Sequence, residues 1–113
     1  MDKAFMTIGG VQYRVEVNWN ALSNFLVAVG RDTLEGLSQI GTMKPSEITS
    51  LMVESIREGE RLEGRDCTLT ALDLGAVLQP QHVGEFMDIY IRQSHPQTAV
   101  EEEPKKEEGQ GEQ

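Results

Sequence analysis

Two adjacent glycines near the N-terminus most constrain what this chain can fold into. Gly9 and Gly10 stand between the segments AFMTI and VQYRV. A two-residue type I′ turn needs positive φ at both central positions, which glycine adopts without steric penalty. The flanking residues alternate between apolar and polar types, as in a half-buried strand. The turn chemistry and the alternation independently predict the same antiparallel β-hairpin.

A two-residue turn also fixes how the strands pair. The register that follows places Ile8 opposite Val11, Met6 opposite Tyr13, and Ala4 opposite Val15. These side chains share one face, which Val17 and Trp19 continue, and we expect Trp19 to pin the first helix onto the hairpin. The other face carries Phe5, Thr7, Gln12, Arg14 and Glu16.

An isolated hairpin is marginal in water, so helices must cover its apolar face. The downstream pattern predicts four helices. The first is capped by Asn18 or Asn20 and ends at Gly30, and the second opens at Asp32–Glu35 and ends at Gly41. The third runs from Pro45 to Gly59, and the fourth starts at Thr70–Asp73. Pro80 either kinks the last of these or begins another helix. The predicted fold class is α+β: a two-stranded hairpin packed on a cluster of four to five short helices, in one domain over residues 1–96.

Two charged segments are predicted to lie outside the core. The segment REGERLEGRD, residues 57–66, is charged and punctuated by glycine, which indicates an exposed loop. Residues 97–113 contain no aromatic residue, and six Glu and two Lys fall within 101–113. Such a composition has little to bury, so we expect a disordered acidic tail.

The net charge of the chain disfavours two classes of binding partner. A formal net charge of -9 over 113 residues makes nucleic acid and anionic membranes unfavourable partners, because affinity for phosphates comes largely from Lys and Arg. The sequence contains neither a signal-peptide pattern nor an apolar run of about 20 residues. We therefore expect a cytoplasmic protein that binds neither nucleic acid nor membrane.

Few residues offer chemistry. Cys67 with His82 or His95 would supply a nucleophile and a base, but no local signature places them together, and a small cysteine more often packs. Two histidines and one cysteine fall short of the ligand patterns of structural zinc. The expectation is a protein that is not an enzyme and uses no cofactor or metal.

The hairpin is the predicted binding element. Two strands alone leave two open edges, which another chain can extend. Phe5, Thr7, Gln12 and Arg14 are therefore the candidate partner-binding residues. In the other interpretation, a helix covers one edge and the second edge is short and solvated.

The order of these features is similar to a known family. The residues that carry the similarity are Ile8, Gly9, Gly10, Tyr13, Val15, Val17, Trp19, Ala21, Leu22, Gly30, Leu34 and Leu37. They resemble the pattern of the tail assembly chaperones of long-tailed bacteriophages, and the likeness spans roughly residues 5–93.

The resemblance implies a non-enzymatic helper in the host cytoplasm. Such a protein binds the tape measure protein and keeps it soluble while tail tube subunits polymerise around it, and the tail tube protein is a second expected partner. The alternative is a general protein-interaction or regulatory module. That module would form a homo-oligomer or bind a partner through the edge of the hairpin.

Overall fold

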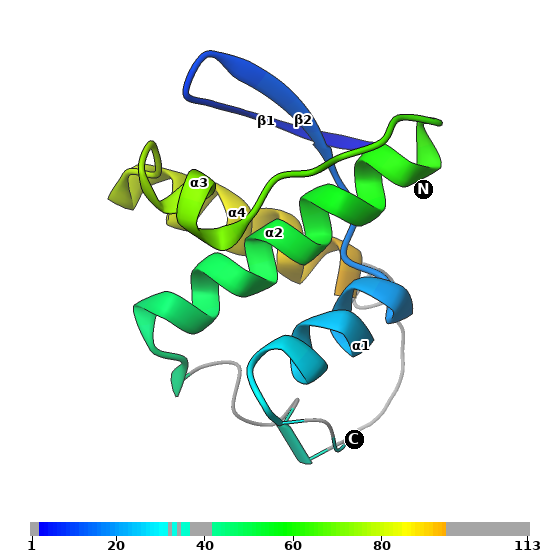
Figure 1. The fold of residues 1–113 in the computed structure, drawn as a ribbon, viewed down its shortest axis with the longest axis vertical. Coiled ribbons are helices and arrows are strands. Elements are labelled where there is room, and N and C mark those ends of the chain that lie inside the picture. Colours follow the sequence, from blue (N-terminus) through cyan, green and yellow to red (C-terminus); the bar gives the residue numbers. More distant parts are fainter. Residues whose placement is uncertain (1–2, 32, 34, 37–41, 95–113) are drawn as a thin grey trace, which may run out of the picture.

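The computed structural model describes residues 3–31, 33, 35–36 and 42–94. This part of the chain forms a hairpin and four helices (Figure 1). The elements are β1 (Ala4–Ile8), β2 (Val11–Val15), α1 (Trp19–Ala28), α2 (Pro45–Leu62), α3 (Ala71–Gly75) and α4 (Pro80–Ser94). The α+β class, with a hairpin packed on short helices, is confirmed.

The hairpin has the predicted register at every pair, from Ile8 with Val11 to Ala4 with Val15. Gly9 and Gly10 have φ values of 61° and 82°, as a type I′ turn requires. The face that the alternation predicted to be apolar is buried at Ala4, Met6, Ile8, Val15 and Val17, while Tyr13 is half-buried and Val11, beside the turn, is exposed.

Helix α2 is the centre of the molecule. It contacts α1, α3 and β2, while α4 contacts β1, and Figure 1 shows α2 crossing between the hairpin and α1. Leu51, Met52 and Ile56 of α2 are buried. These side chains join the buried face of the hairpin in one core with Phe25, Leu26, Leu74, Phe86 and Ile89.

The helix ends follow their capping residues. The side-chain oxygen of Asn18 accepts a hydrogen bond from the backbone of Ala21 at 3.0 Å, and Thr70 caps α3 through Asp73 at 3.1 Å. Gly30 follows α1 with φ 77°, and Pro80 begins α4 rather than kinking α3. The predicted helix at 32–41 lies partly outside the described residues, and the tail at 97–113 lies wholly outside them.

Two predictions are wrong. The segment predicted as a loop at 57–66 continues α2 as far as Leu62, and its residues Glu58, Gly59 and Glu60 are buried. Trp19 does not pack on the hairpin: it is 67% exposed. The strand alternation ends at Asn18, which caps α1. As the first residue of α1, Trp19 follows the helical period, which directs it away from the core.

Candidate protein-binding surfaces

The outer edge of β2 is closed by α2. The two-residue turn makes the pairs Ile8–Val11, Met6–Tyr13 and Ala4–Val15 the hydrogen-bonded ones, so the backbone N–H groups of Arg14 and Glu16 point away from β1. The Arg14 N–H donates to the Glu60 carboxylate at 2.9 Å. The Glu16 N–H donates to the Ser55 carbonyl, within α2, at 3.0 Å.

Small residues on α2 allow the helix to come within hydrogen-bonding distance of the backbone of β2. Ser55 and Gly59 are four residues apart and so lie on one side of the helix. A Cβ placed on Gly59 would collide with the backbone carbonyl of Arg14. The Ser55 hydroxyl turns back and donates to the Leu51 carbonyl at 2.8 Å. The glycine that the sequence presents as a helix breaker is therefore a point of close approach between helix and strand.

Ion pairs complete the closure around Arg14. Its guanidinium lies 2.9 Å from both Glu16 and Glu63, and its side chain is 12% exposed. Glu63 also pairs with Lys3 at 3.0 Å. Hydrogen bonds from Lys3 and Arg14, with that from Lys3 the larger effect, lower the pKa of Glu63. The charged side chains around Arg14 are thus paired with one another within the molecule.

Glu60 joins the same contact from α2. It binds Arg65 through two hydrogen bonds of 2.7 and 3.0 Å. The hydrogen bond from Arg65, followed by that from the Arg14 backbone, holds the pKa of Glu60 below its ordinary value against the effect of burial. A carboxylate on α2 therefore takes the place that a third strand would have beside Arg14.

The end of β2 is held by α4. Gln93 is buried, and its side-chain oxygen accepts from the Val17 N–H at 2.6 Å. Its side-chain nitrogen donates to the Val15 carbonyl at 3.2 Å. One amide side chain thus satisfies both a donor and an acceptor of the strand backbone, which no feature of the sequence indicates.

The four predicted partner-binding residues divide into two groups. Arg14 is engaged inside the molecule, whereas Phe5, Thr7 and Gln12 are exposed. The backbone N–H groups of Phe5 and Thr7 point away from β2 and make no hydrogen bond to any part of the chain that the structure describes. The edge of β1 is open, and that of β2 is covered at Arg14 and Glu16.

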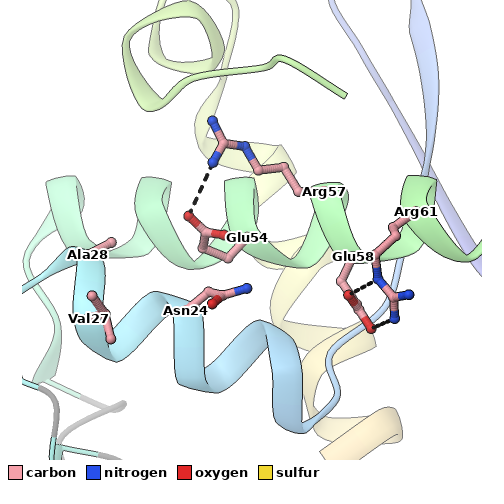
Figure 2. A pocket seen from close by; sticks show the side chains of 7 residues that line it. All are labelled: Asn24, Val27, Ala28, Glu54, Arg57, Glu58 and Arg61. Carbon is pink, nitrogen blue, oxygen red and sulfur yellow. Dashed lines mark hydrogen bonds and ion pairs between the residues drawn. The ribbon is translucent and has the colours of Figure 1, made fainter. Parts of the chain in front are cut away.

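A second surface lies where α1 meets α2. Figure 2 shows a groove between these helices, with Asn24, Val27 and Ala28 on the α1 side. Its α2 side is formed by Glu54, Arg57, Glu58 and Arg61. The ten residues of α1, WNALSNFLVA, include no charged side chain.

The solvent side of α1 carries apolar groups. Trp19, Ser23 and Val27 are spaced four residues apart and follow one side of the helix; we call them the α1 outer face. Trp19 and Val27 are 67% and 66% exposed. Val27 also lines the adjoining groove, so the outer face borders the groove at this residue.

The acidic side chains of the groove are more buried than the basic ones. The side chains of Glu54 and Glu58 are 14% and 4% exposed, against 41% and 61% for their partners Arg57 and Arg61. Arg61 binds Glu58 through two hydrogen bonds of 2.9 and 2.8 Å. The carboxylates therefore point inward and the guanidinium groups outward.

Glu58 ties the groove to the start of α1. Its carboxylate accepts hydrogen bonds from Asn18 at 2.7 Å and Asn20 at 3.2 Å. The hydrogen bond from Arg61, with smaller effects from Asn18 and Asn20, lowers the pKa of Glu58 to about 2, against the opposing effect of desolvation. Because Asn18 also caps α1, this carboxylate fixes the helix beside the groove.

Sequence reasoning missed this surface, although a signal for it exists. The apolar stripe of Leu22, Phe25, Leu26 and Val29 already supplies the core face of α1, which leaves Trp19 and Val27 without a place in it. A helix that lacks charge and has apolar residues outside its core stripe indicates a contact surface. Assigning Trp19 to the hairpin face concealed that pattern.

In the described residues, no hydrogen bond joins Cys67 to His82, one of the catalytic pairs considered from the sequence. Cys67 packs half-buried against the core, and the buried His82 accepts a hydrogen bond from the Gln79 backbone at 2.9 Å. His95 lies outside the described residues. In the described ranges, no three His, Cys, Asp or Glu side chains come together as a metal site.

Two further findings concern the chain as a whole. Over the described residues, none of the helices combines the length and the apolar character that crossing a membrane requires. Comparison with protein-family models, with curated proteins and with solved structures gives no match to this chain.

Proposed function

We propose that this protein is an assembly chaperone of the kind found in long-tailed bacteriophages. It binds the tape measure protein in the host cytoplasm, without catalysis, and keeps it soluble while the tail tube assembles. Residues that carry the resemblance have clear places in the fold: Gly9 and Gly10 make the turn, Val15 and Val17 are buried, and Gly30 ends α1.

The α1 outer face is the observation that carries the proposal. A soluble protein that holds another chain in solution needs exposed apolar contact area and a charged remainder that keeps the complex dispersed. Trp19 and Val27 supply exposed apolar area on an uncharged helix. The net charge of -9 supplies the repulsion between complexes.

Co-expression with the tape measure protein of the same genome tests the proposal. We expect the tape measure protein to move from the insoluble to the soluble fraction and to co-purify with this protein. The control is co-expression with a helical protein of similar length from another source, which should stay insoluble. Unchanged solubility of the tape measure protein, with no co-purification, would contradict the proposal.

The open edge of β1 favours a second candidate function. Its unpaired N–H groups at Phe5 and Thr7 offer a site at which a strand of a second copy or of another protein could add. A Thr7→Pro variant removes one of these outward donors and no bond within the hairpin. If the edge joins two copies, this variant sediments as a monomer at concentrations where the unmodified protein is a dimer; a monomeric unmodified protein at high concentration excludes self-pairing.

A further inference from the structure

We infer that the α1 outer face and the guanidinium groups of Arg57 and Arg61 together bind one amphipathic helix of the partner, whose apolar stripe is flanked by Asp or Glu. The inference rests on the proposed function and names the element of the tape measure protein that this chain binds.

The apolar half of the surface fits a helix. Because the backbone of α1 is hydrogen-bonded within the helix, α1 offers only side chains to a partner, unlike the edge of β1. Its ten residues extend over about 15 Å, and helices pack side by side at about 8–10 Å through such rows of side chains. A partner helix laid along α1 would cover Val27 and bring its own apolar stripe against Trp19.

The charged half of the surface selects an acidic helix. The molecule carries a net charge of -9, yet the most exposed charged groups at this groove are the guanidinium groups of Arg57 and Arg61, whereas Glu58 is buried and Glu54 is half-buried. Glu58 engages the Nε and Nη2 groups of Arg61, and Arg57 uses Nε on the Leu69 carbonyl and Nη1 on Glu54. Within the described part of the chain, one N–H₂ group on each arginine has no partner, and a carboxylate is the partner that such a group binds best.

Charge also decides between a second copy and another protein. Two copies of this chain would bring -9 against -9, and such repulsion opposes association at low salt. A partner helix with local acidic residues and an overall charge near zero or above it meets no such penalty. The occupant of this surface is therefore a helix of the partner protein.

Trp19 allows a test at the site itself. It is the single tryptophan of the chain and is 67% exposed, so its emission maximum reports whether the α1 outer face is covered. The probes are overlapping 25-residue synthetic peptides that span the tape measure protein of the same genome, titrated into the full chain. We expect saturable blue shifts with peptides that form amphipathic helices with Asp or Glu beside the apolar stripe.

Substitutions assign the effect to the two halves of the surface. Val27→Glu and the double variant R57Q/R61Q should each weaken binding of the shifting peptide at least tenfold, with an unchanged melting temperature for Val27→Glu. Leu72→Glu is the matched control, because Leu72 is an exposed apolar residue on α3. This variant should bind the peptide with the same affinity as the unmodified protein. Replacing the peptide's acidic residues with Lys should abolish the shift.

The outcomes separate this inference from the proposed function. If the tape measure protein co-purifies but Trp19 emission does not move and Val27→Glu binds normally, the surface is wrong and the proposed function stands. If no complex forms, both fail. Preferential binding of basic peptides, or a blue shift that appears on concentrating this protein alone, would also overturn the inference, the latter in favour of a second copy.

Discussion

Helix α2 packs differently against two of its neighbours, β2 and α1. Against β2 it brings Ser55, Gly59 and Glu60 into direct contact with the strand backbone, and the surrounding charges pair with one another. Against α1 it leaves a groove, and the outward side of α1 is uncharged and apolar. The contrast teaches that charged residues do not identify the exposed surface of this protein. Glu58, Gly59 and Glu60 of the charged segment at 57–66 are buried, whereas the uncharged helix α1 has an exposed apolar side.

Gly59→Ala breaks the closed region most severely. Alanine is the better helix former by about 1 kcal/mol, but its Cβ would collide with the Arg14 carbonyl, so we expect a net loss of about 3 kcal/mol in the free energy of unfolding. Urea denaturation measures this. Gly84→Ala on α4, where a Cβ meets nothing within 4 Å, should instead gain about 0.5–1 kcal/mol. Equal gains at both positions would show that α2 does not touch β2.

Gln93→Leu tests the support of the same strand from α4. The leucine fills a similar volume but leaves the buried N–H of Val17 without an acceptor. We expect unfolding free energy to fall by about 2 kcal/mol. Gln93→Glu keeps an acceptor for Val17 but loses the donor to Val15, so its effect by the same assay should differ from that of leucine. An unchanged free energy of unfolding for Gln93→Leu would contradict the hydrogen bonds that Gln93 makes to the backbone of Val17 and Val15.

Acid titration sharpens the comparison at Glu58. Its pKa in the folded protein is lowered from 4.5 to about 2, so its carboxylate stabilises the fold above pH 4.5, and that stability is lost as the pH falls from about 4.5 to about 2. Glu58→Gln should lower stability at pH 7 by about 1–2 kcal/mol, since solvent screens the exposed Arg61. The difference in unfolding free energy between the two proteins should vanish near pH 2. A constant difference from pH 7 to 2 would show that these contacts do not stabilise the ionised form of Glu58.

Trp19→Ala should have the smallest effect on folding. An exposed side chain that packs on no core contributes little, so we expect the unfolding free energy to change by no more than about 0.5 kcal/mol. The predicted role as a pin between α1 and the hairpin would instead require a loss of several kcal/mol, as for a buried aromatic residue such as Phe86. Chemical denaturation followed by circular dichroism distinguishes the two.

Local signals explain which parts of the fold were predictable. Gly9 and Gly10 specify a turn by their backbone conformation, and Asn18 and Thr70 specify helix starts through their side chains, so each signal acts within a few residues. Gly59 was misread because its role depends on Arg14, 45 positions earlier in the sequence. A glycine that admits a strand and a glycine that ends a helix look the same in sequence.

The partner-binding role of the hairpin was harder to predict for a similar reason. The outward position of Phe5 and Thr7 follows from the register alone. Arg14 is engaged by Glu16, two residues away, and by Glu63, which only the path of α2 brings to it. Trp19 stands at the change from strand to helix, where the two periodicities assign opposite directions to its side chain.

Residue-resolved amide hydrogen exchange in the free protein tests most directly the claim that α2 closes one edge of the hairpin. The N–H groups of Arg14 and Glu16, bound to Glu60 and Ser55, should exchange as slowly as those between the two strands. The N–H groups of Phe5 and Thr7, on the open edge, should exchange quickly. Exchange at Arg14 and Glu16 as fast as at Phe5 and Thr7 would show that both edges are open and would contradict the account.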